Sequence, residues 1–598
     1  MNHEGSNFIT PTVNYEAPLE DMAFQLKTFG YEEVAALENF EDFDFETATA
    51  TLSDAADILI EQWLPVNAIG DRVGVQYNPS DKSVTLPDGF KEAYDAYAES
   101  GYMAIGYPVE FDGEGAPHML SLMIGEIQIA TNKSLSMCPG LSHGLISALK
   151  GYGTDEQKKT WIPKLVTGEW AGTMCLTEPQ AGTDLGLVYT TAEPKGDGSY
   201  SITGSKIWIT FGEHDLTENI IHLVLARLPD APPGIKGIST FIVPKYKLNG
   251  EKNGIICSGV DHKMGIHASP TCVMSMDDAE GYLIGTPHKG MRCMFVMMNE
   301  ARLSVGLEGL SLSEASYQAA LDFAKERRQG RSLNKERVER DQEADTILVH
   351  PDVRRQLLRI RSTTEAMRGL ACYAAKHIDL SHYHPDEKQR QKSDDIVALL
   401  TPIIKSFFTD RGFLNTSDAM QICGGIGYTQ EWPIEQYMRD VRIAPIYEGT
   451  NHVQALDLVG RKLLIGGGRL IRTFGAEYGG LLASVKGDER FDEFVKPAKH
   501  AFDTLTKLSM HLAMNGPKDP EMIAAVASEY LNVFGYASFA FSWVHQVKAA
   551  YALNNDYGAT KIKMARFFFR HVFPEMDAHA AIVLNGKDAM MDFSADEF

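Results

Sequence analysis

The chain has 598 residues, more than a single hydrophobic core usually serves, so several domains or one multi-lobed enzyme are expected. Hydrophobic residues make up 44% and charged residues 23%, which is ordinary for a globular protein. The formal net charge of -24 excludes an extended nucleic-acid interface, because phosphate binding requires clustered Lys and Arg. A nucleotide cofactor is not excluded, since a local pocket can be basic on an acidic surface.

Cysteine usage and the first residues narrow the class further. The seven cysteines are scattered and contain no CxxC pair, so buried reduced thiols are expected and no metal site is predicted. The first eighteen residues lack the basic start and apolar core of a signal peptide. No apolar run reaches transmembrane length. We therefore expect a cytoplasmic enzyme.

Apolar residues at helical spacing predict a helical lobe in roughly the first 170 residues. The spacing recurs from Leu52 to Trp63, where Pro65 ends it, and again from Met119 to Leu149. From about residue 170 the pattern changes to short β-prone runs bounded by Gly and Pro, namely 201–203, 206–210, 220–225 and 240–243. These runs predict a small barrel or sandwich.

Helical spacing returns near Met291 and continues to the end of the sequence. A segment of mixed charge, 326–345, predicts a solvated loop between two long helices. The glycine run 466–468 marks the start of a further helical module, in which a turn is expected at 515–517. The predicted fold is mainly α with a middle β-domain: a helical N-terminal domain (1–170), a β-domain (171–285), a helical bundle (286–465) and an additional helical module (466–598).

Four segments carry candidate chemistry, and the first is LTEPQAGTDLG (176–186). Its proline and glycines force an irregular turn in which backbone N–H groups converge. Such a loop suits a flat ligand rich in carbonyl oxygens, such as an isoalloxazine ring. Without further context, an ordinary surface loop explains it equally well.

The second segment is GSKIWIT (204–210), where Trp208 and Thr210 lie two residues apart on a predicted strand. Residues at this spacing share one face of a strand, so the indole could cover a flat ring while the hydroxyl donates a hydrogen bond. For this segment alone, a core tryptophan is the favoured alternative.

The third segment is QICGGIGY (421–428). Its three glycines disfavour a helix interior and permit close approach of a phosphate or another backbone. A helix C-cap explains the pattern nearly as well.

The fourth segment runs from Arg439-Asp440 to IYEGTNHVQ (446–454). Glu448, between Tyr447 and Gly449 at a predicted loop-to-helix turn, can project its carboxylate into a pocket. Partial burial would raise the pKa of this carboxyl and make it a better base toward a carbon acid. The alternative is a glutamate at a helix N-terminus beside a threonine cap.

Together and in this order, the four segments closely resemble the acyl-CoA dehydrogenase family, over roughly residues 90–465. The family fold is a helical N-terminal domain, a middle β-domain and a four-helix bundle, which is the predicted order. The resemblance implies bound FAD and an acyl-CoA substrate. Departures from the family pattern are Phe211, where Asn is frequent, and His452, where Gln is frequent.

The resemblance also implies roles for individual residues. The base would be Glu448, and acyl-CoA contacts would come from Thr183, Arg302 and Gly449. Flavin contacts would come from Leu176, Thr177, Trp208, Thr210 and Thr450. The FAD of a neighbouring subunit would be contacted by Arg327, Gln421, Gly424 and Gly425. The family places its base either in the YEG turn or directly before the buried arginine. Ala301 fills that second position, and Glu300 is about 100° away on a helix.

On this basis Glu448 takes the C2 proton while a hydride leaves C3 for the flavin, giving a trans-2-enoyl-CoA. In the family, the thioester oxygen accepts hydrogen bonds from the backbone N–H of the base and from a ribityl hydroxyl. The resemblance implies an electron-transfer flavoprotein as acceptor and a homo-oligomer, of which a dimer is expected. Alternatives are an acyl-CoA oxidase, a flavin monooxygenase, which would usually lack the YEG carboxylate, and a non-enzymatic scaffold.

The chain is longer than the short- and medium-chain members of the family. Its segments 15–24 and 211–215 and its extra C-terminal module resemble a bacterial branch that includes 3-methylmercaptopropionyl-CoA dehydrogenase, an enzyme of dimethylsulfoniopropionate degradation, and broad-specificity fatty acyl-CoA dehydrogenases. A linear acyl-CoA is therefore expected, with 3-methylmercaptopropionyl-CoA as the leading candidate, because a thioether resembles a methylene in size and polarity. A medium- or long-chain fatty acyl-CoA is the alternative.

Overall fold

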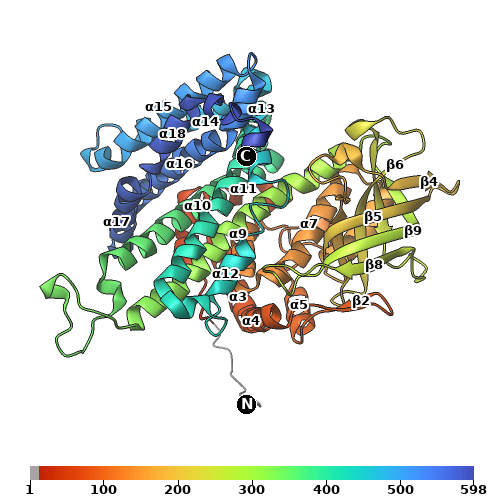
Figure 1. The fold of residues 1–598 in the computed structure, drawn as a ribbon, viewed down its shortest axis with the longest axis horizontal. Helices are drawn as coiled ribbons and strands as arrows, with labels where there is room; N and C mark the ends of the chain where they lie inside the picture. The colour runs from red at the N-terminus through yellow and green to blue at the C-terminus, as the bar shows by residue number, and fades with distance from the viewer. Residues whose placement is uncertain (1–12) are drawn as a thin grey trace. The chain divides into compact units, whose positions relative to one another are not determined.

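The computed structural model describes residues 13–598, apart from the side chains of residues 299 and 300, and the chain forms two compact units (Figure 1). The barrel unit comprises residues 54–116 and 127–304, and the helical unit comprises residues 13–53, 117–126 and 305–598. Three helices run from one unit into the other: α3 (Phe45–Gln62), α6 (His118–Thr131) and α9 (Gly290–Glu326). Of the first eighteen residues, which are expected not to form a signal peptide, residues 1–12 lie outside the described residues.

The barrel unit contains a closed sheet, which confirms the predicted β-domain and selects a barrel over a sandwich. Its strands are β3 (Trp170–Cys175), β4 (Thr191–Pro194), β5 (Tyr200–Thr210), β6 (Asn219–Arg227), β7 (Ile238–Pro244), β8 (Ile255–Val260) and β9 (Thr271–Ile284). They pair in the order β3-β6-β4-β5-β9-β7, with β8 on β9, and an antiparallel β6–β7 pairing closes the ring. β6 and β7 are buried along almost their whole length, as their continuous apolar sequences require.

The barrel unit also contains helices, namely α4 (Leu64–Val73), α5 (Phe90–Glu99), α7 (Lys133–Tyr152) and α8 (Asp155–Val166). Of these, α7 and α8 pack on β3. The predicted apolar stretch from Met119 to Leu149 is two helices, because Asn132 ends α6 and caps α7 by accepting a hydrogen bond from the Leu135 N–H (3.0 Å). A short hairpin, β1 (Gln76–Asn78) and β2 (Ser83–Thr85), interrupts the lobe that was expected to be helical throughout.

The helical unit is built from long helices. In addition to α9, its N-terminal part contributes α1 (Leu19–Thr28) and α2 (Tyr31–Ala35). The bundle adds α10 (Pro351–Tyr383), α11 (Glu387–Cys423), α12 (Ile434–Val441) and α13 (Asn451–Gly460). The C-terminal module consists of α14 (Arg469–Ser484), α15 (Asp492–Asn515), α16 (Pro520–Leu553), α17 (Asp556–His571), α18 (Glu575–Asn585) and α19 (Asp588–Met591). α9 and α11 cross closely at Gly309, where an added Cβ would lie 2.2 Å from the Phe408 carbonyl oxygen. In the C-terminal module, α15 and α18 both pack on α16 (Figure 1).

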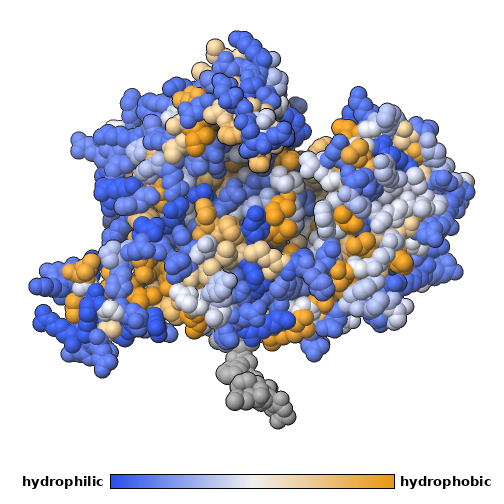
Figure 2. All heavy atoms as spheres, in the orientation of Figure 1, coloured by the Kyte–Doolittle hydropathy of each residue, from blue (hydrophilic) through white to orange (hydrophobic). Residues whose placement is uncertain are grey.

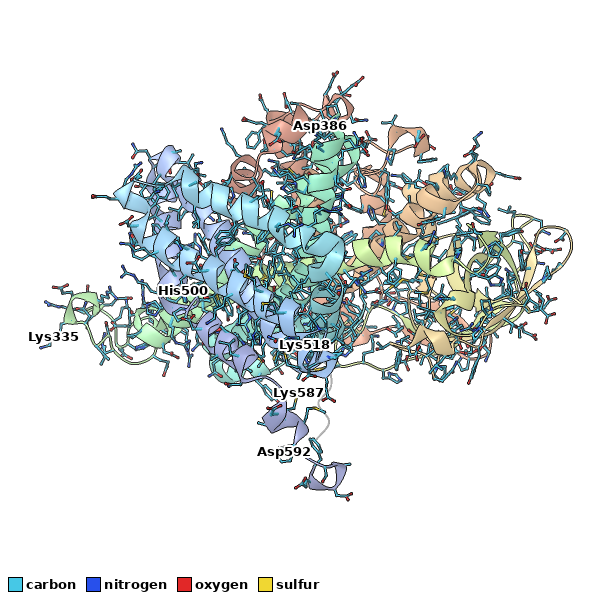
Figure 3. All side chains as sticks on the ribbon, turned by 90° about the horizontal axis from the view of Figure 1, so that it is seen from above. Lys335, Asp386, His500, Lys518, Lys587 and Asp592 are labelled. Carbon is cyan, nitrogen blue, oxygen red and sulfur yellow. The ribbon has the colours of Figure 1, made fainter. Side chains whose placement is uncertain are left out.

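The three predicted breaks in the helical pattern after residue 291 are confirmed; the last lies between α15, which ends at Asn515, and α16, which begins at Pro520. α9 ends at Glu326 and α10 begins at Pro351, and the intervening segment projects outward with Lys335 at its far end (Figures 1 and 3). Buried Asp345 fixes this segment by accepting hydrogen bonds from the Ser332 and Glu339 N–H groups, both at 2.7 Å. Between α13 and α14 the three glycines 466–468 all have positive φ, which separates the two helices.

A buried cluster of charged side chains joins the helices of the helical unit. Arg368 on α10 forms ion pairs with Glu126 (2.6 Å), Glu314 (2.7 Å) and Asp21. Lys561 on α17 pairs with the same Asp21 and with Glu365, the latter at 2.8 Å. The cluster therefore ties helix α1 to the bundle and to the C-terminal module. We refer to these residues as the Arg368 cluster.

General surface properties agree with the composition. Each of the seven cysteines is buried and forms no disulfide, as predicted. Hydrophilic side chains dominate the face drawn in Figure 2, and hydrophobic ones form separate patches. Among the helices of residues 13–598, none combines the length and apolarity needed to cross a membrane. The cytoplasmic location and the four domain boundaries stay predictions.

Candidate active site

Trp208 lies in a β-bulge of β5. Lys206 pairs with Met274 and Ile209 with Cys272, so three residue steps on β5 oppose two on β9. Trp208 itself has a φ of 58°, a left-handed conformation that is uncommon for a residue with a side chain. Its indole is 62% exposed, so the core position favoured from this segment alone is wrong.

The end of β3 lies directly beside this bulge. The Ile207 N–H donates to the Thr177 carbonyl oxygen (2.9 Å), and Lys206 Nζ donates to the Leu176 carbonyl oxygen (3.1 Å). Thr177 and Thr210 are both half-buried. The barrel unit therefore brings two of the four sequence segments together and presents an exposed indole near two threonines.

A buried ion pair holds the two segments in place. Lys206 Nζ lies 2.8 Å from Glu178 Oε1, and both side chains are shielded from solvent. Glu178 also accepts hydrogen bonds from the Tyr189 N–H (2.7 Å), the Thr190 N–H (3.1 Å) and the Thr190 hydroxyl (2.6 Å). Burial by itself would raise the pKa of Glu178, but the charge of Lys206 and these hydrogen bonds lower that pKa to about 2.

The remainder of the first segment is the irregular loop that its composition predicts. Glu178 and Ala181 close a turn through reciprocal backbone hydrogen bonds of 3.1 and 2.9 Å. Thr183 follows in exposed backbone, and Asp184 caps the short helix after it. Arg302 is buried on α9, and Ala301 precedes it in the same helix. The side chain of Glu300, the weaker alternative base, lies outside the described residues.

In the helical unit, Glu448 lies in a turn between α12 and α13. Its φ is 55°, and that of Gly449 is 82°. Gln454 Nε2 donates to the carbonyl oxygens of both residues, at 3.2 and 3.0 Å. Thr450 caps α13 by accepting a hydrogen bond from the Val453 N–H (3.3 Å). The predicted threonine cap exists, but half-buried Glu448 precedes it in non-helical backbone.

Side chains from α9 and α11 support this turn. Asn451 Nδ2 donates to Asp410 Oδ1 (2.7 Å), and Lys405 Nζ donates to Asn451 Oδ1 (2.9 Å). The Tyr447 hydroxyl donates to the Glu308 carboxylate, and burial together with that carboxylate raises the pKa of Tyr447 well above its usual range. The residues on both sides of Glu448 are therefore fixed by the bundle.

The three glycines of segment 421–428 are not all required for the same structural reason. Gly424 ends α11 with a φ of 63°, as a C-cap requires. At Gly427 an added Cβ would lie 2.6 Å from the Met420 carbonyl oxygen, so packing requires glycine there. At Gly425 an added Cβ would meet nothing within 4 Å. Gly425 is therefore explained neither by the cap nor by internal packing, and it is exposed beside exposed Gln421.

Arg327 directly follows α9 and is exposed. The Ile347 N–H donates to its carbonyl oxygen (2.8 Å), which fixes the backbone at the start of the projecting segment. Phe323, one turn earlier on α9, packs against Trp432 with 6.0 Å between ring centroids. The helix end that carries Arg327 thus lies near the chain that follows the glycine segment.

The predicted site residues are distributed over both units. Leu176, Thr177, Thr183, Trp208, Thr210 and Arg302 belong to the barrel unit, and Arg327, Gln421, Gly424, Gly425, Glu448, Gly449 and Thr450 belong to the helical unit. Sequence patterns do not identify the residues that hold the turns, chiefly Glu178, Lys206, Gln454 and Asn451. One signal was available: a lysine within an apolar barrel strand requires a buried partner.

Four family models match the chain along most of its length. The acyl-CoA dehydrogenase N-terminal domain matches residues 77–169, the middle domain 173–279, the C-terminal domain 336–464, and the acetyl-CoA dehydrogenase C-terminal-like domain 471–594.

Individual relatives extend over nearly the whole chain. The 3-methylmercaptopropionyl-CoA dehydrogenase of Ruegeria pomeroyi is 38% identical, over 97% of this chain and 100% of the relative. The broad-specificity linear acyl-CoA dehydrogenase FadE5 of Mycobacterium tuberculosis is 31% identical, over 95% and 97%. The structure of an acyl-CoA dehydrogenase from Bacillus anthracis complexed with FAD shares the fold, with a TM-score of 0.74 and 22% identity over 92% of this chain and 90% of that one. The chain belongs to the acyl-CoA dehydrogenase family, the FAD-dependent oxidoreductases that act on CH–CH donors.

Proposed function

We propose that this protein binds FAD and dehydrogenates a linear acyl-CoA between C2 and C3, with Glu448 as the general base. The observation that carries the proposal is the turn at Glu448. A half-buried carboxylate side chain on left-handed backbone, fixed by Gln454 and by neighbours anchored to the bundle, is expensive to maintain without a function.

The residues of the barrel unit fit a flavin. An exposed indole at Trp208 offers a flat apolar surface, and the half-buried hydroxyls of Thr177 and Thr210 offer hydrogen bonds near it. Arg327 and Gly425 fit the rest of such a cofactor, since the first provides an exposed guanidinium and the second an open approach to backbone. When bound, FAD would supply the hydride acceptor for C3.

The chain's own contribution is the removal of a proton and the control of geometry. Glu448 accepts the C2 proton of the thioester. Because Gln454 Nε2 donates to the carbonyl oxygens of both Glu448 and Gly449, the backbone that carries the carboxylate is held in place and little reorganisation is needed when substrate binds. Thr183 and Arg302 are proposed to meet the acyl-CoA.

The proposed substrate is a linear acyl-CoA of short to medium length, with 3-methylmercaptopropionyl-CoA as the leading candidate. Its support is the 38% identity to the Ruegeria enzyme, together with the similarity to an enzyme whose name gives broad specificity for linear acyl-CoAs. A hydrophobic pocket separates substrates that differ by one methylene by only ~1–3 kcal/mol. Butyryl-CoA and hexanoyl-CoA are therefore expected to react as well.

Two partners are also proposed. Arg327 and Gly425 are exposed in the helical unit, and we infer that they serve the FAD of a second subunit, so that the enzyme is at least a dimer. An electron-transfer flavoprotein is the proposed electron acceptor. A monomeric mass in light scattering with full FAD content would contradict the first inference, and rapid peroxide release in air would contradict the second.

Glu448→Gln is the decisive variant, because it keeps the shape of the side chain and removes its basicity. The purified variant should be yellow and retain FAD, while anaerobic bleaching of the flavin by substrate slows ~10²-fold to 10⁴-fold. Glu489→Gln, an exposed site in the same unit, should bleach at the native rate. Bleaching of Glu448→Gln at the native rate would show that another group is the base.

Substrate choice requires its own experiment. We would measure kcat/KM for linear acyl-CoAs from butyryl-CoA to palmitoyl-CoA, together with 3-methylmercaptopropionyl-CoA and the branched isovaleryl-CoA. The thioether and the shorter linear substrates are expected to lead. A clear preference for isovaleryl-CoA, or activity with palmitoyl-CoA alone, would overturn the substrate proposal and leave the family unchanged.

A further inference from the structure

An open apolar groove lies on the C-terminal module between α15 and α18. It has a volume of about 520 Å³, and its apolar lining includes Phe502, Met510, Met514 and Leu584. Met510 and Met514 are 61% and 70% exposed. Methionine side chains are flexible and polarisable, so a surface of this kind adapts to apolar side chains of a partner.

The tail of the same module, residues 586–598, also exposes apolar side chains. All its residues from 588 onward are exposed, among them the large apolar side chains of Met590, Met591, Phe593 and Phe598. The tail is ordered by its own contacts, since the Phe593 and Phe598 rings lie 6.0 Å apart. In Figure 3 the chain continues from Lys587 to Asp592 away from the body of the protein. The tail thus presents apolar side chains that nothing in the described chain covers.

Charge and length match between the groove and the tail. The groove residues include Lys507 and His511, and also Asp503, whose carboxylate is paired with Lys499. The tail carries one lysine, Lys587, and the acidic side chains of Asp588, Asp592, Asp596 and Glu597. The groove follows α15 from Phe502 to Met514, which at about 1.5 Å per residue is roughly 18 Å. A partly helical tail of this size spans a similar distance.

The start of the tail is directed by specific contacts. Lys587 Nζ lies 2.8 Å from both Asp519 Oδ1 and Glu521 Oε2, at the N-terminal end of α16. Gly586 has a φ of 68° and turns the chain at the end of α18. Both features fix the start of the tail at the N-terminal end of α16.

We propose that the tail of one copy of this protein docks into the α15–α18 groove of a second copy. In a two-fold assembly the contact occurs twice, once in each direction. The apolar side chains of the tail fill the methionine-lined groove, and its carboxylates face Lys507 and His511. This surface is separate from the residues assigned to FAD and acyl-CoA, so the proposal stands independently of the proposed function.

Disulfide trapping tests the proposal. Because all seven native cysteines are buried, Met514→Cys and Phe593→Cys introduced together supply the accessible thiols. Mild oxidation is expected to give a covalent dimer on a non-reducing gel, and mass spectrometry should identify a peptide pair joined through the two introduced thiols. Adding Lys507→Glu should slow this linkage several-fold, because it places like charges in contact. Ile235→Cys, an exposed site in the barrel unit, replaces Met514→Cys in the control and should give no such link to the tail.

Each other outcome contradicts the proposal. A link between the two introduced thiols that is confined to the monomer band would place the tail in its own groove. Absence of the joined peptide pair, or an equal rate with Ile235→Cys, would show that the groove does not receive the tail. Phe593→Asp provides a second measurement that does not depend on thiols: it alters only an exposed side chain, and it should weaken self-association in sedimentation experiments.

Discussion

The bulge at Trp208 and the turn at Glu448 present the same backbone feature in two regions that differ in how they stabilise it. Both carry a proposed site residue with φ near 55–60°, a conformation that side chains disfavour. At Trp208 a buried ion pair, Lys206 with Glu178, fixes the surrounding segments. At Glu448 the direct support is an uncharged amide, Gln454, that binds two carbonyl oxygens.

The two supports should respond differently to the loss of a charge. A buried ion pair is stable only while both charges are present, because either charge left alone in the interior is costly. An amide bound to backbone carbonyls has no charge to lose, and its removal costs only ordinary hydrogen bonds. The segments around Trp208 therefore depend directly on the charges of Lys206 and Glu178. By contrast, the amide that contacts the Glu448 turn directly carries no charge, and charged groups act there through Tyr447 and Asn451.

The largest loss of stability is expected for Lys206→Met, because this substitution leaves the Glu178 carboxylate buried without its cation. Loss of one member of such a pair typically costs about 3–5 kcal/mol, so the barrel unit should melt at a markedly lower temperature. Lys206→Met combined with Glu178→Gln should recover most of that loss, because the amide keeps hydrogen-bonding capacity without a charge. Lys195→Met, at an ion pair with exposed Asp278, serves as the control and should cost at most about 1 kcal/mol. Equal losses of stability for Lys206→Met and Lys195→Met would show that the buried ion pair matters no more than the exposed one.

Acid should act on the same pair. The folded protein lowers the pKa of Glu178 from 4.5 to about 2, so its contribution to stability is complete above pH 4.5 and disappears as the pH falls through about 2. Between pH 6 and pH 3 this group should cost the protein about 2 kcal/mol of unfolding free energy. The measurement is the difference in urea stability between native protein and Glu178→Gln at several pH values. A difference that does not shrink with acid would contradict the assigned pKa.

Gln454→Leu tests the uncharged support. The substitution removes two hydrogen bonds to the Glu448 turn, which should cost about 1–2 kcal/mol. If the amide positions the base, kcat should fall while KM for the acyl-CoA changes little, and the pH profile of stability should stay parallel to that of the native protein. His452→Ala, two residues earlier, is the matched control. A fall in stability with unchanged kcat would make Gln454 structural only.

The smallest change in stability is expected for Glu448→Gly. Glycine adopts a φ of 55° without steric strain, so the variant should lose catalysis and yet be as stable as the native protein, or more stable by up to about 1 kcal/mol. Ile446→Gly, at a neighbouring position without positive φ, should destabilise instead. A clear destabilisation by Glu448→Gly would show that the turn is not strained.

The sequence was informative where the signal is local. Helical spacing located the bundle, and four short segments identified the family. Gly and Pro punctuation located β5, β6 and β7 but not β3, β4, β8 and β9. The hairpin at 76–85 was missed because its strands have three residues each, too few to show an alternation. The segment taken alone favoured a core position for Trp208, because strand alternation assumes a regular ladder, which the bulge breaks.

Partners far apart in the chain were beyond local patterns. Glu178 and Lys206 are 28 residues apart, and Tyr447 and Glu308 are 139 apart. A lysine in an apolar strand indicates that some partner exists, but many carboxylates compete for that role. Which of them is the partner depends on the fold, so the residues that hold the two turns became visible only in three dimensions.

The Arg368 cluster also sets an order of events during synthesis. Asp21 is separated by 347 residues from Arg368 and by 540 from Lys561. At a ribosomal rate of roughly 5–20 residues per second, helix α1 leaves the ribosome about half a minute to two minutes before its last partner. Until then its buried acid has no complete set of counter-charges. Helix α1 is therefore fixed in place late, and its apolar face must be shielded from aggregation while the chain is completed.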